Sequence, residues 1–197
     1  AVAAVMVLLA ERFARADGTD RTRASLATMS ALATLAFTFS ILFTDAALTI
    51  ALAAVVASAA ALDRQFKLPL MEWFILAGVA ALSYRLVVDP GLPGYQLDQG
   101  PALLLAQAAA TAACLAGYNL LKALDRPKAK LTLESGSWAF AGIFLCTAMA
   151  VVIDAFVPTL RVIDEHWGLG LYASVWIIVS MVQLWRMEHI AGFRKVR

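Results

Sequence analysis

The chain has 197 residues, of which 62% are hydrophobic and 15% charged, and its net charge is +2. Soluble domains contain about 45–50% apolar and about 25% charged residues, and the mean hydropathy of this chain is +0.78. This composition excludes a soluble enzyme, a disordered tail and a disulfide scaffold, and the small net charge gives no reason to expect nucleic-acid binding. The chain is therefore expected to lie in a membrane, with lipids as partners and no nucleic acid.

Six apolar segments are long enough to cross a bilayer, whose hydrocarbon core of about 30 Å needs roughly 20 residues of helix. In chain order they are 24–43, 46–62, 68–88, 101–121, 136–157 and 168–185. Residues 1–10 are apolar but too short to span, and they begin without Met, so we interpret them as a truncated N-terminal helix. The predicted fold is an all-α polytopic transmembrane helix bundle, a single helical region with six complete spans, expected to be a fragment of a longer protein.

The connection between the first two spans is only Thr44-Asp45, which requires an antiparallel hairpin. Asp45 is expected to cap the second span, because free amides and the positive end of the helix dipole favour a carboxylate there. Close packing drives helix association in lipid, so contacts are expected along rows of small residues four apart. These rows are Ala53, Ala57 and Ala61; Ala109, Ala113 and Gly117; and Gly142, Cys146 and Ala150.

The basic residues predict the orientation of the chain. Fourteen of the 16 Lys and Arg residues lie within 12–23, 64–67, 122–130 and 186–197. Because insertion retains such connections on the cytoplasmic side, we place these four stretches in the cytoplasm, together with the C-terminus. The expected location is the cytoplasmic (inner) membrane of a bacterium, in which the chain is a multi-pass protein.

The fourth span carries four side chains at steps of four, three and four, which places them on one face of a helix. They are Gln107, Thr111, Cys114 and Tyr118. One interpretation is the polar wall of a cavity or substrate path; the other, which we favour, is a set of interhelical hydrogen bonds. Neither cysteine has the spacing of a disulfide or metal motif, and we predict no metal and no cofactor.

A second candidate site lies at the outer ends of the helices, on the side of the membrane away from the basic stretches. Its residues are Arg85, Asp89, Asp154, Asp164, Glu165 and His166. Ionisable groups close to hydrocarbon are functional candidates, so one hypothesis is an outward site for a cation, a sugar or a lipid-linked substrate. The alternative, which we favour, is interfacial salt bridges, caps and solvated loop charge, with Arg85 and Asp89 one helical turn apart.

The third span and the loop after it resemble a known family. The helix is entered through Lys67-Leu68-Pro69-Leu70-Met71-Glu72-Trp73, ends in Tyr84-Arg85-Leu86-Val87-Val88-Asp89-Pro90, and is followed by Gly94-Tyr95. This pattern looks like the bacterial domain-of-unknown-function 2339 family of large inner-membrane proteins with many Ala- and Leu-rich helices, over residues 24–157. In this chain the next helix starts with Gln99-Gly100-Pro101 instead of the aromatic or Asn residue frequent in the family. The resemblance implies a longer parent protein and brings no established activity.

Three classes of function remain open. The first is a structural or interaction subunit that packs with other membrane proteins or with the remainder of the parent chain. The second is a segment of a transporter or channel with an outward-facing acidic site, although no span has the mid-helix break that transporters often show. The third is a multi-pass transferase acting on lipid-linked substrates at the periplasmic face, for which outer loops of 10 to 12 residues are small. An enzyme is therefore the least favoured class.

Overall fold

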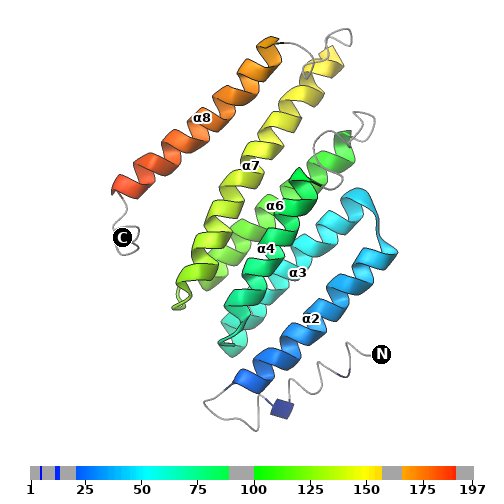
Figure 1. The fold of residues 1–197 in the computed structure, drawn as a ribbon, viewed down its shortest axis with the longest axis vertical. Helices are drawn as coiled ribbons and strands as arrows, with labels where there is room; N and C mark the ends of the chain where they lie inside the picture. Colours follow the sequence, from blue (N-terminus) through cyan, green and yellow to red (C-terminus); the bar gives the residue numbers. More distant parts are fainter. Residues whose placement is uncertain (1–4, 6–11, 14–20, 89–99, 157–165, 190–197) are drawn as a thin grey trace. The chain divides into compact units, whose positions relative to one another are not determined.

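The computed structural model describes residues 5, 12–13, 21–88, 100–156 and 166–189. Six helices make up most of these residues, which contain no strand, and the predicted all-α fold is confirmed (Figure 1). Their bounds are α2 Thr22–Leu42, α3 Asp45–Phe66, α4 Met71–Val87, α6 Gly100–Leu121, α7 Pro127–Phe156 and α8 His166–His189. The truncated helix expected at residues 1–10 lies, apart from Val5, outside the described residues.

Five helices of the described chain are long and apolar enough to cross a membrane, and α4 is the exception. With 17 residues, α4 is about 25 Å long, at the lower limit of spanning length. It is shorter than the predicted span 68–88 because Pro69 and Leu70 form a turn before the helix. The helices support a multi-pass membrane protein.

The fifth predicted span, 136–157, makes up the larger part of a longer helix, because α7 begins at Pro127. Proline suits the first position of a helix, where its missing N–H has no partner to lose. The backbone amides of Lys128 and Ala129 are bound by a carboxylate of α4. The helix therefore starts before the apolar segment and includes residues 127–135. The resulting 30 residues extend for about 45 Å, which exceeds the thickness of the hydrocarbon core.

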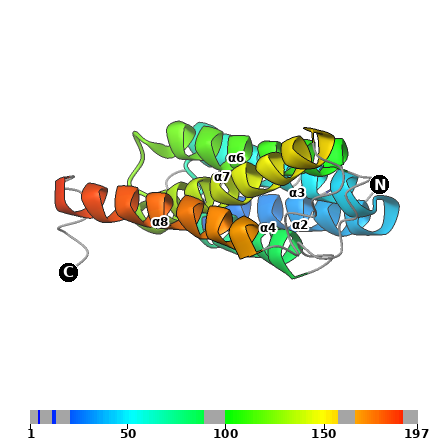
Figure 2. The ribbon, with the colours of Figure 1, turned by 90° about the horizontal axis from the view of Figure 1, so that it is seen from above.

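The described helices divide into two compact units, and the boundary lies within α7, between Phe140 and Ala141. In the first unit α3 is central: it packs most extensively on α6 and also on α4 and α2. Figures 1 and 2 show α2 and α3 as the predicted antiparallel hairpin. The largest fully buried apolar side chains are Val56, Leu68, Met71, Ile75, Leu82, Leu86, Leu121, Leu133 and Phe140.

Three glycines let the helices of the first unit approach closely. A Cβ atom on Gly78 of α4 would lie 2.7 Å from Val56 Cγ2 of α3. A Cβ on Gly117 of α6 would lie 3.2 Å from Leu133 of α7, and one on Gly136 of α7 would lie 3.0 Å from a Val79 methyl of α4. Such contacts supply the van der Waals attraction that holds helices together in lipid.

The predicted rows of small residues lie in these contacts only in part. Gly117 is at a helix contact, as expected, but along α3 the row begins buried at Ala53 and ends exposed at Ala61. Positions four apart advance by 400° around a helix, so such a row moves steadily out of one contact. In the second unit Gly142 of α7 faces α8, where a Cβ would lie 3.4 Å from the ring of Trp176.

The expectation that Asp45 caps α3 is also wrong. The helix begins at Asp45 itself, and no side-chain hydrogen bond caps it. Asp45 has a φ of 46°, because the chain reverses direction over two residues and an aspartate tolerates the left-handed region better than most residues. Its carboxylate in the first turn still has the charge that the helix dipole favours.

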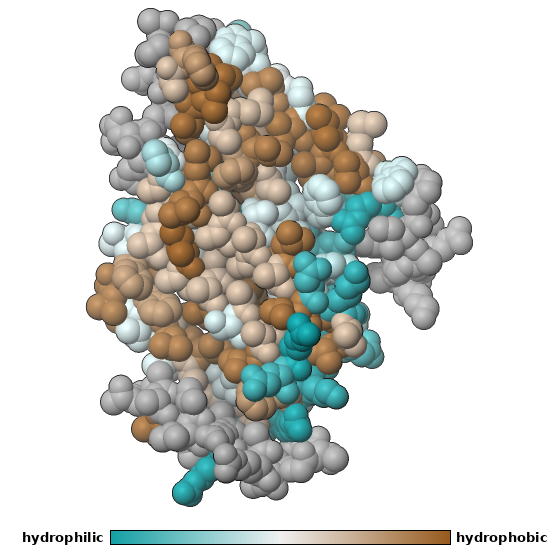
Figure 3. All heavy atoms as spheres, turned by 180° about the vertical axis from the view of Figure 1, so that it is seen from behind, coloured by the Kyte–Doolittle hydropathy of each residue, from teal (hydrophilic) through white to brown (hydrophobic). Residues whose placement is uncertain are grey.

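Large apolar side chains cover the outside of the described helices. Figure 3 shows apolar surface over most of one face. Among these exposed residues are Phe37, Ile41, Leu105, Leu115, Ile178 and Met181. Soluble proteins rarely expose contiguous apolar patches larger than a few hundred Å², so this exterior suits contact with lipid or with other membrane helices.

We expect Gly78→Ala to lower the free energy of unfolding by about 1–3 kcal/mol, because the added Cβ overpacks the contact with Val56. Mixed-micelle denaturation followed by circular dichroism measures this change. Gly170→Ala is the matched control, since a Cβ on Gly170 of α8 meets nothing within 4 Å and alanine is the better helix former by about 1 kcal/mol. Equal effects of the two substitutions would show that α3 and α4 do not approach this closely.

Candidate functional site

The polar face predicted on the fourth span lies on α6, mostly inside the first unit. Gln107 and Cys114 are fully buried, and Tyr118 is half-buried. The hydroxyl of Thr111 donates a hydrogen bond to the backbone carbonyl of Gln107 at 2.9 Å, within its own helix. Cys114 meets α7, where a Cβ on Gly136 would lie 3.4 Å from its sulfur. The middle of this face is therefore a helix contact.

The outer candidate site is described only in part. Asp89, Asp164 and Glu165 lie outside the described residues, as does the side chain of Asp154 in α7. His166 is the exposed first residue of α8, in the second unit. Arg85, at the end of α4, donates from Nη2 to the backbone carbonyl of Asp45 at 3.1 Å. Arg85 thus joins the end of α4 to the start of α3.

A cluster of charged side chains lies at the other end of the first unit, and it contains more hydrogen bonds between side chains and neighbouring elements than the outer candidate site does among its described residues. Asp63, near the end of α3, has a fully buried side chain, and the side chain of Arg126, just before α7, is 19% exposed. Arg126 donates from Nε to Asp63 Oδ2 at 2.9 Å and from Nη2 to Oδ1 at 3.2 Å. This two-pronged geometry matches the planar guanidinium to both oxygens of the carboxylate.

Arg126 also donates hydrogen bonds to two backbone carbonyls, one in the α3–α4 connection and one in the α6–α7 connection. Its Nη2 donates to the carbonyl of Leu68 at 3.2 Å, and its Nη1 to the carbonyl of Asp125 at 3.4 Å. The hydrogen bonds to Asp63 raise the pKa of Arg126, and partial burial opposes them. One guanidinium therefore stays charged while it holds the end of α3, the start of the α3–α4 connection and the α6–α7 connection together.

Glu72, in the first turn of α4, binds the N-terminus of α7. Its Oε1 accepts hydrogen bonds from the backbone N–H of Lys128 at 2.7 Å and of Ala129 at 3.1 Å. A carboxylate at this position satisfies amides that have no partner within the helix and meets the positive end of its dipole. Next to it the ammonium of Lys128 lies 4.3 Å from the centre of the Trp73 ring, within cation–π range. We call Asp63, Glu72, Arg126 and Lys128 the helix-end cluster.

The helix-end cluster brings together connections that the charge pattern assigns to one side of the membrane. The α3–α4 and α6–α7 connections meet at Asp63 and Arg126, and Arg21, before α2, donates a hydrogen bond to the carbonyl of Phe66. Three of the four basic stretches, those around Arg21, Arg64 and Arg126, therefore lie at the same end of the first unit. Asp63 and Glu72 were not predicted to be site residues. A signal was present, because both carboxylates lie close to the basic stretch 64–67 and could be expected to find basic partners.

No protein-family model, no curated protein and no solved structure matches the chain. The resemblance of residues 24–157 to the domain-of-unknown-function 2339 family therefore stays a prediction. Within the described part of the chain, no group of three or more His, Cys, Asp and Glu residues is arranged to hold a metal ion. The helix-end cluster joins α3 and α4 to the α6–α7 connection and to the start of α7.

We expect Arg126→Gln to lower the free energy of unfolding by about 3–5 kcal/mol, because it leaves the buried Asp63 carboxylate without its charged partner. Arg126→Lys should lose less, since an ammonium keeps the charge but not the two-pronged geometry. Mixed-micelle denaturation measures both. Arg64→Gln is the control: it makes the same change at an exposed arginine adjacent to Asp63. Similar losses in Arg64→Gln and Arg126→Gln would contradict a structural role for the ion pair.

We expect Glu72→Ala to fray the first turns of α7 at a cost of about 0.5–2 kcal/mol, the range for loss of a helix cap. Glu72→Gln keeps a carbonyl oxygen as acceptor and should retain part of the stability. Hydrogen–deuterium exchange at Lys128 and Ala129 is the measurement, and faster exchange is expected in the alanine variant. Unchanged exchange there would mean that Glu72 does not cap the helix.

Proposed function

We propose that the chain is a structural or interaction subunit of the bacterial cytoplasmic membrane, whose helices pack with other membrane proteins. The observation that carries the proposal is the outward face of α2. Its exposed side chains recur at steps of four, three, four and four, which aligns them along one stripe of the helix. They are Leu26, Ser30, Ala33, Phe37 and Ile41. We call these five residues the α2 stripe.

The composition of the α2 stripe suits a partner helix. Two small residues, Ser30 and Ala33, lie in its middle, and larger apolar residues flank them on both sides. Small side chains let two helix backbones approach, and serine hydroxyls form hydrogen bonds across helices in membranes. Within the most apolar 18 residues of each helix, 17% are buried in α2, against 39% in α3 and 44% in α6. Thus α2 has far more surface to offer than the two central helices of its unit.

The roles of the charged residues favour a structural subunit over the alternatives. Asp63, Glu72 and Arg126 hold helix ends and connections together, which suits a rigid scaffold. The transferase hypothesis draws its support from the outer candidate site, of which only Arg85 and His166 have described side chains. Of these, Arg85 binds the backbone at the start of α3. The transporter hypothesis draws on that site and on the polar face of α6, where Gln107 and Cys114 are buried.

The orientation and family are parts of the same proposal. We place the helix-end cluster and the C-terminus on the cytoplasmic side, because Lys and Arg are retained there during insertion. The meeting of the α3–α4 and α6–α7 connections at Asp63 and Arg126 supports a shared side for them. Membership of the domain-of-unknown-function 2339 family would make the remainder of a longer parent chain a further packing partner.

We expect the double variant Ser30→Leu/Ala33→Leu to separate the chain from its partner, because leucines fill the space that a second helix backbone would occupy. Purification from native membranes in mild detergent, with native mass spectrometry of the product, should show about tenfold less of the complex, equivalent to about 1.4 kcal/mol.

The control for this experiment is Ala112→Leu, the same enlargement at an exposed alanine on α6. It should leave the complex intact. A wild-type chain that always purifies alone would refute the subunit role, and equal losses in the two variants would refute the α2 stripe as the contact.

A further inference from the structure

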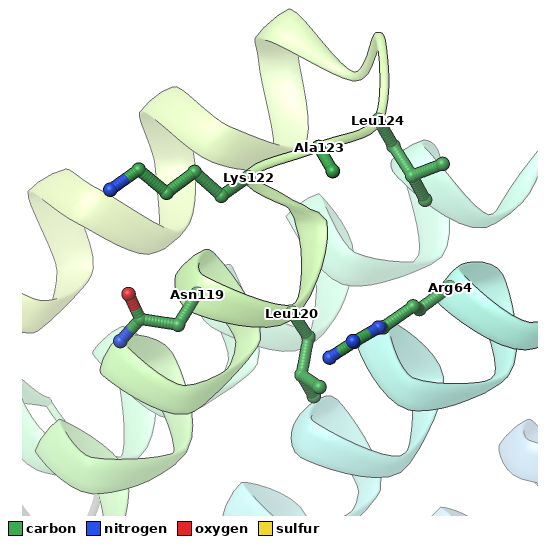
Figure 4. A pocket seen from close by; sticks show the side chains of 6 residues that line it. All are labelled: Arg64, Asn119, Leu120, Lys122, Ala123 and Leu124. Atoms are coloured by element: carbon green, nitrogen blue, oxygen red, sulfur yellow. The ribbon is translucent and has the colours of Figure 1, made fainter.

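A pocket of about 430 Å³ lies where the ends of α3 and α6 meet the α6–α7 connection (Figure 4). It is separate from the α2 stripe, on which the proposed function rests. Its lining residues are Arg64, Asn119, Leu120, Lys122, Ala123 and Leu124. Since α3 and α6 are both long and apolar enough to cross a membrane and end here, we expect the pocket at the level of the lipid headgroups.

Among the described residues that line the pocket, two are positively charged and none is a carboxylate. Arg64 and Lys122 are both exposed, and within the described residues neither takes part in an ion pair. The carboxylate next to Arg64 in the sequence, Asp63, is buried and engaged by Arg126 on both of its oxygens. An anion that enters the pocket therefore meets two cations that form no ion pair with the described part of the chain.

Asn119 adds a hydrogen-bond acceptor to this charge. Its Nδ2 donates to the backbone carbonyl of Leu115 at 3.0 Å, which leaves the side-chain carbonyl oxygen to accept. Figure 4 shows the amide of Asn119 and the ammonium of Lys122 reaching toward the same side, while Arg64 extends from α3 toward Leu120. Cations bind phosphate oxygens, and an amide oxygen accepts from a hydroxyl. The pocket thus suits a phosphate with a hydroxyl group close by.

The surface below the pocket indicates the source of such a phosphate. On α6, exposed apolar residues precede Asn119 at steps of four and seven, on the same side of the helix. They are Leu115 and Ala112, and Leu105 lies one further step of seven from Ala112. This continuous apolar strip leads from the pocket into the membrane, as an acyl chain attached to a bound headgroup would.

We propose that this pocket binds the headgroup of an anionic phospholipid: Arg64 and Lys122 bind the phosphate, Asn119 accepts from a headgroup hydroxyl, and the exposed side of α6 contacts an acyl chain. Basic pockets between membrane helices are a recurrent setting for such headgroups. Phosphatidylglycerol has the required chemistry, a phosphodiester with free hydroxyls.

The test compares lipid binding by the whole purified chain in detergent. Titration with phosphatidylglycerol, phosphatidylcholine or inorganic phosphate is followed by native mass spectrometry and by the melting temperature. We expect phosphatidylglycerol to be retained and to raise the melting temperature, and neither of the other two to do so. In Arg64→Gln/Lys122→Gln the affinity for phosphatidylglycerol should fall about 30-fold, through the loss of two basic contacts at the membrane surface.

The control is Arg23→Gln/Lys67→Gln, which likewise removes one exposed arginine and one exposed lysine, but from residues outside both the pocket and the helix-end cluster. It should bind phosphatidylglycerol within about threefold of the wild type. Equal losses in the two double variants would overturn the pocket as the site. Binding of inorganic phosphate as tight as that of phosphatidylglycerol would overturn the lipid as the source. An unchanged affinity of Arg64→Gln/Lys122→Gln for phosphatidylglycerol would overturn the proposal altogether.

Discussion

A carboxylate that is fully buried at the end of a membrane helix constrains the whole first unit. Asp63 has no contact with solvent, and Arg126, 63 residues away, supplies both of its hydrogen bonds. A buried ion pair adds little to stability compared with well-packed apolar residues, but a buried charge without its partner is strongly unfavourable. The pair therefore selects one arrangement of the α3–α4 and α6–α7 connections against all others, and Glu72 then engages the N-terminus of α7 beside it.

Along the length of the helices the arrangement depends on size instead of charge. Hydrocarbon provides no hydrophobic force between helices, so attraction comes from close contact. Gly78, Gly117 and Gly136 lie at points where a Cβ would stand 2.7–3.2 Å from a neighbouring helix. The charged ends set which helices are neighbours, and the glycines set how near they come. The two kinds of contact are complementary, because a close approach has value only in the correct pairing.

Sequence reasoning predicts the fold better than it predicts the site, for physical reasons. Runs of apolar residues locate helices well, because lipid requires every backbone amide to be satisfied within a helix. The same hydropathy signal stops at polar residues, so the span predicted at 136–157 did not show that the helix extends back to Pro127. Asp63 and Glu72 escaped notice because their partners, Arg126 and the amides after Pro127, are 56 or more residues away. A single sequence shows which residues are charged, but not which distant connection each of them meets.

The separation between Asp63 and Arg126 has a consequence for biosynthesis. The ribosome synthesises the chain from its N-terminus, so α3 is made before Arg126 has been translated. Until 63 further residues have been translated, Asp63 has no Arg126 with which to pair, and burying its charge alone is strongly unfavourable. The burial of this carboxylate can therefore be completed only after α6, which precedes Arg126 in the chain, has been synthesised.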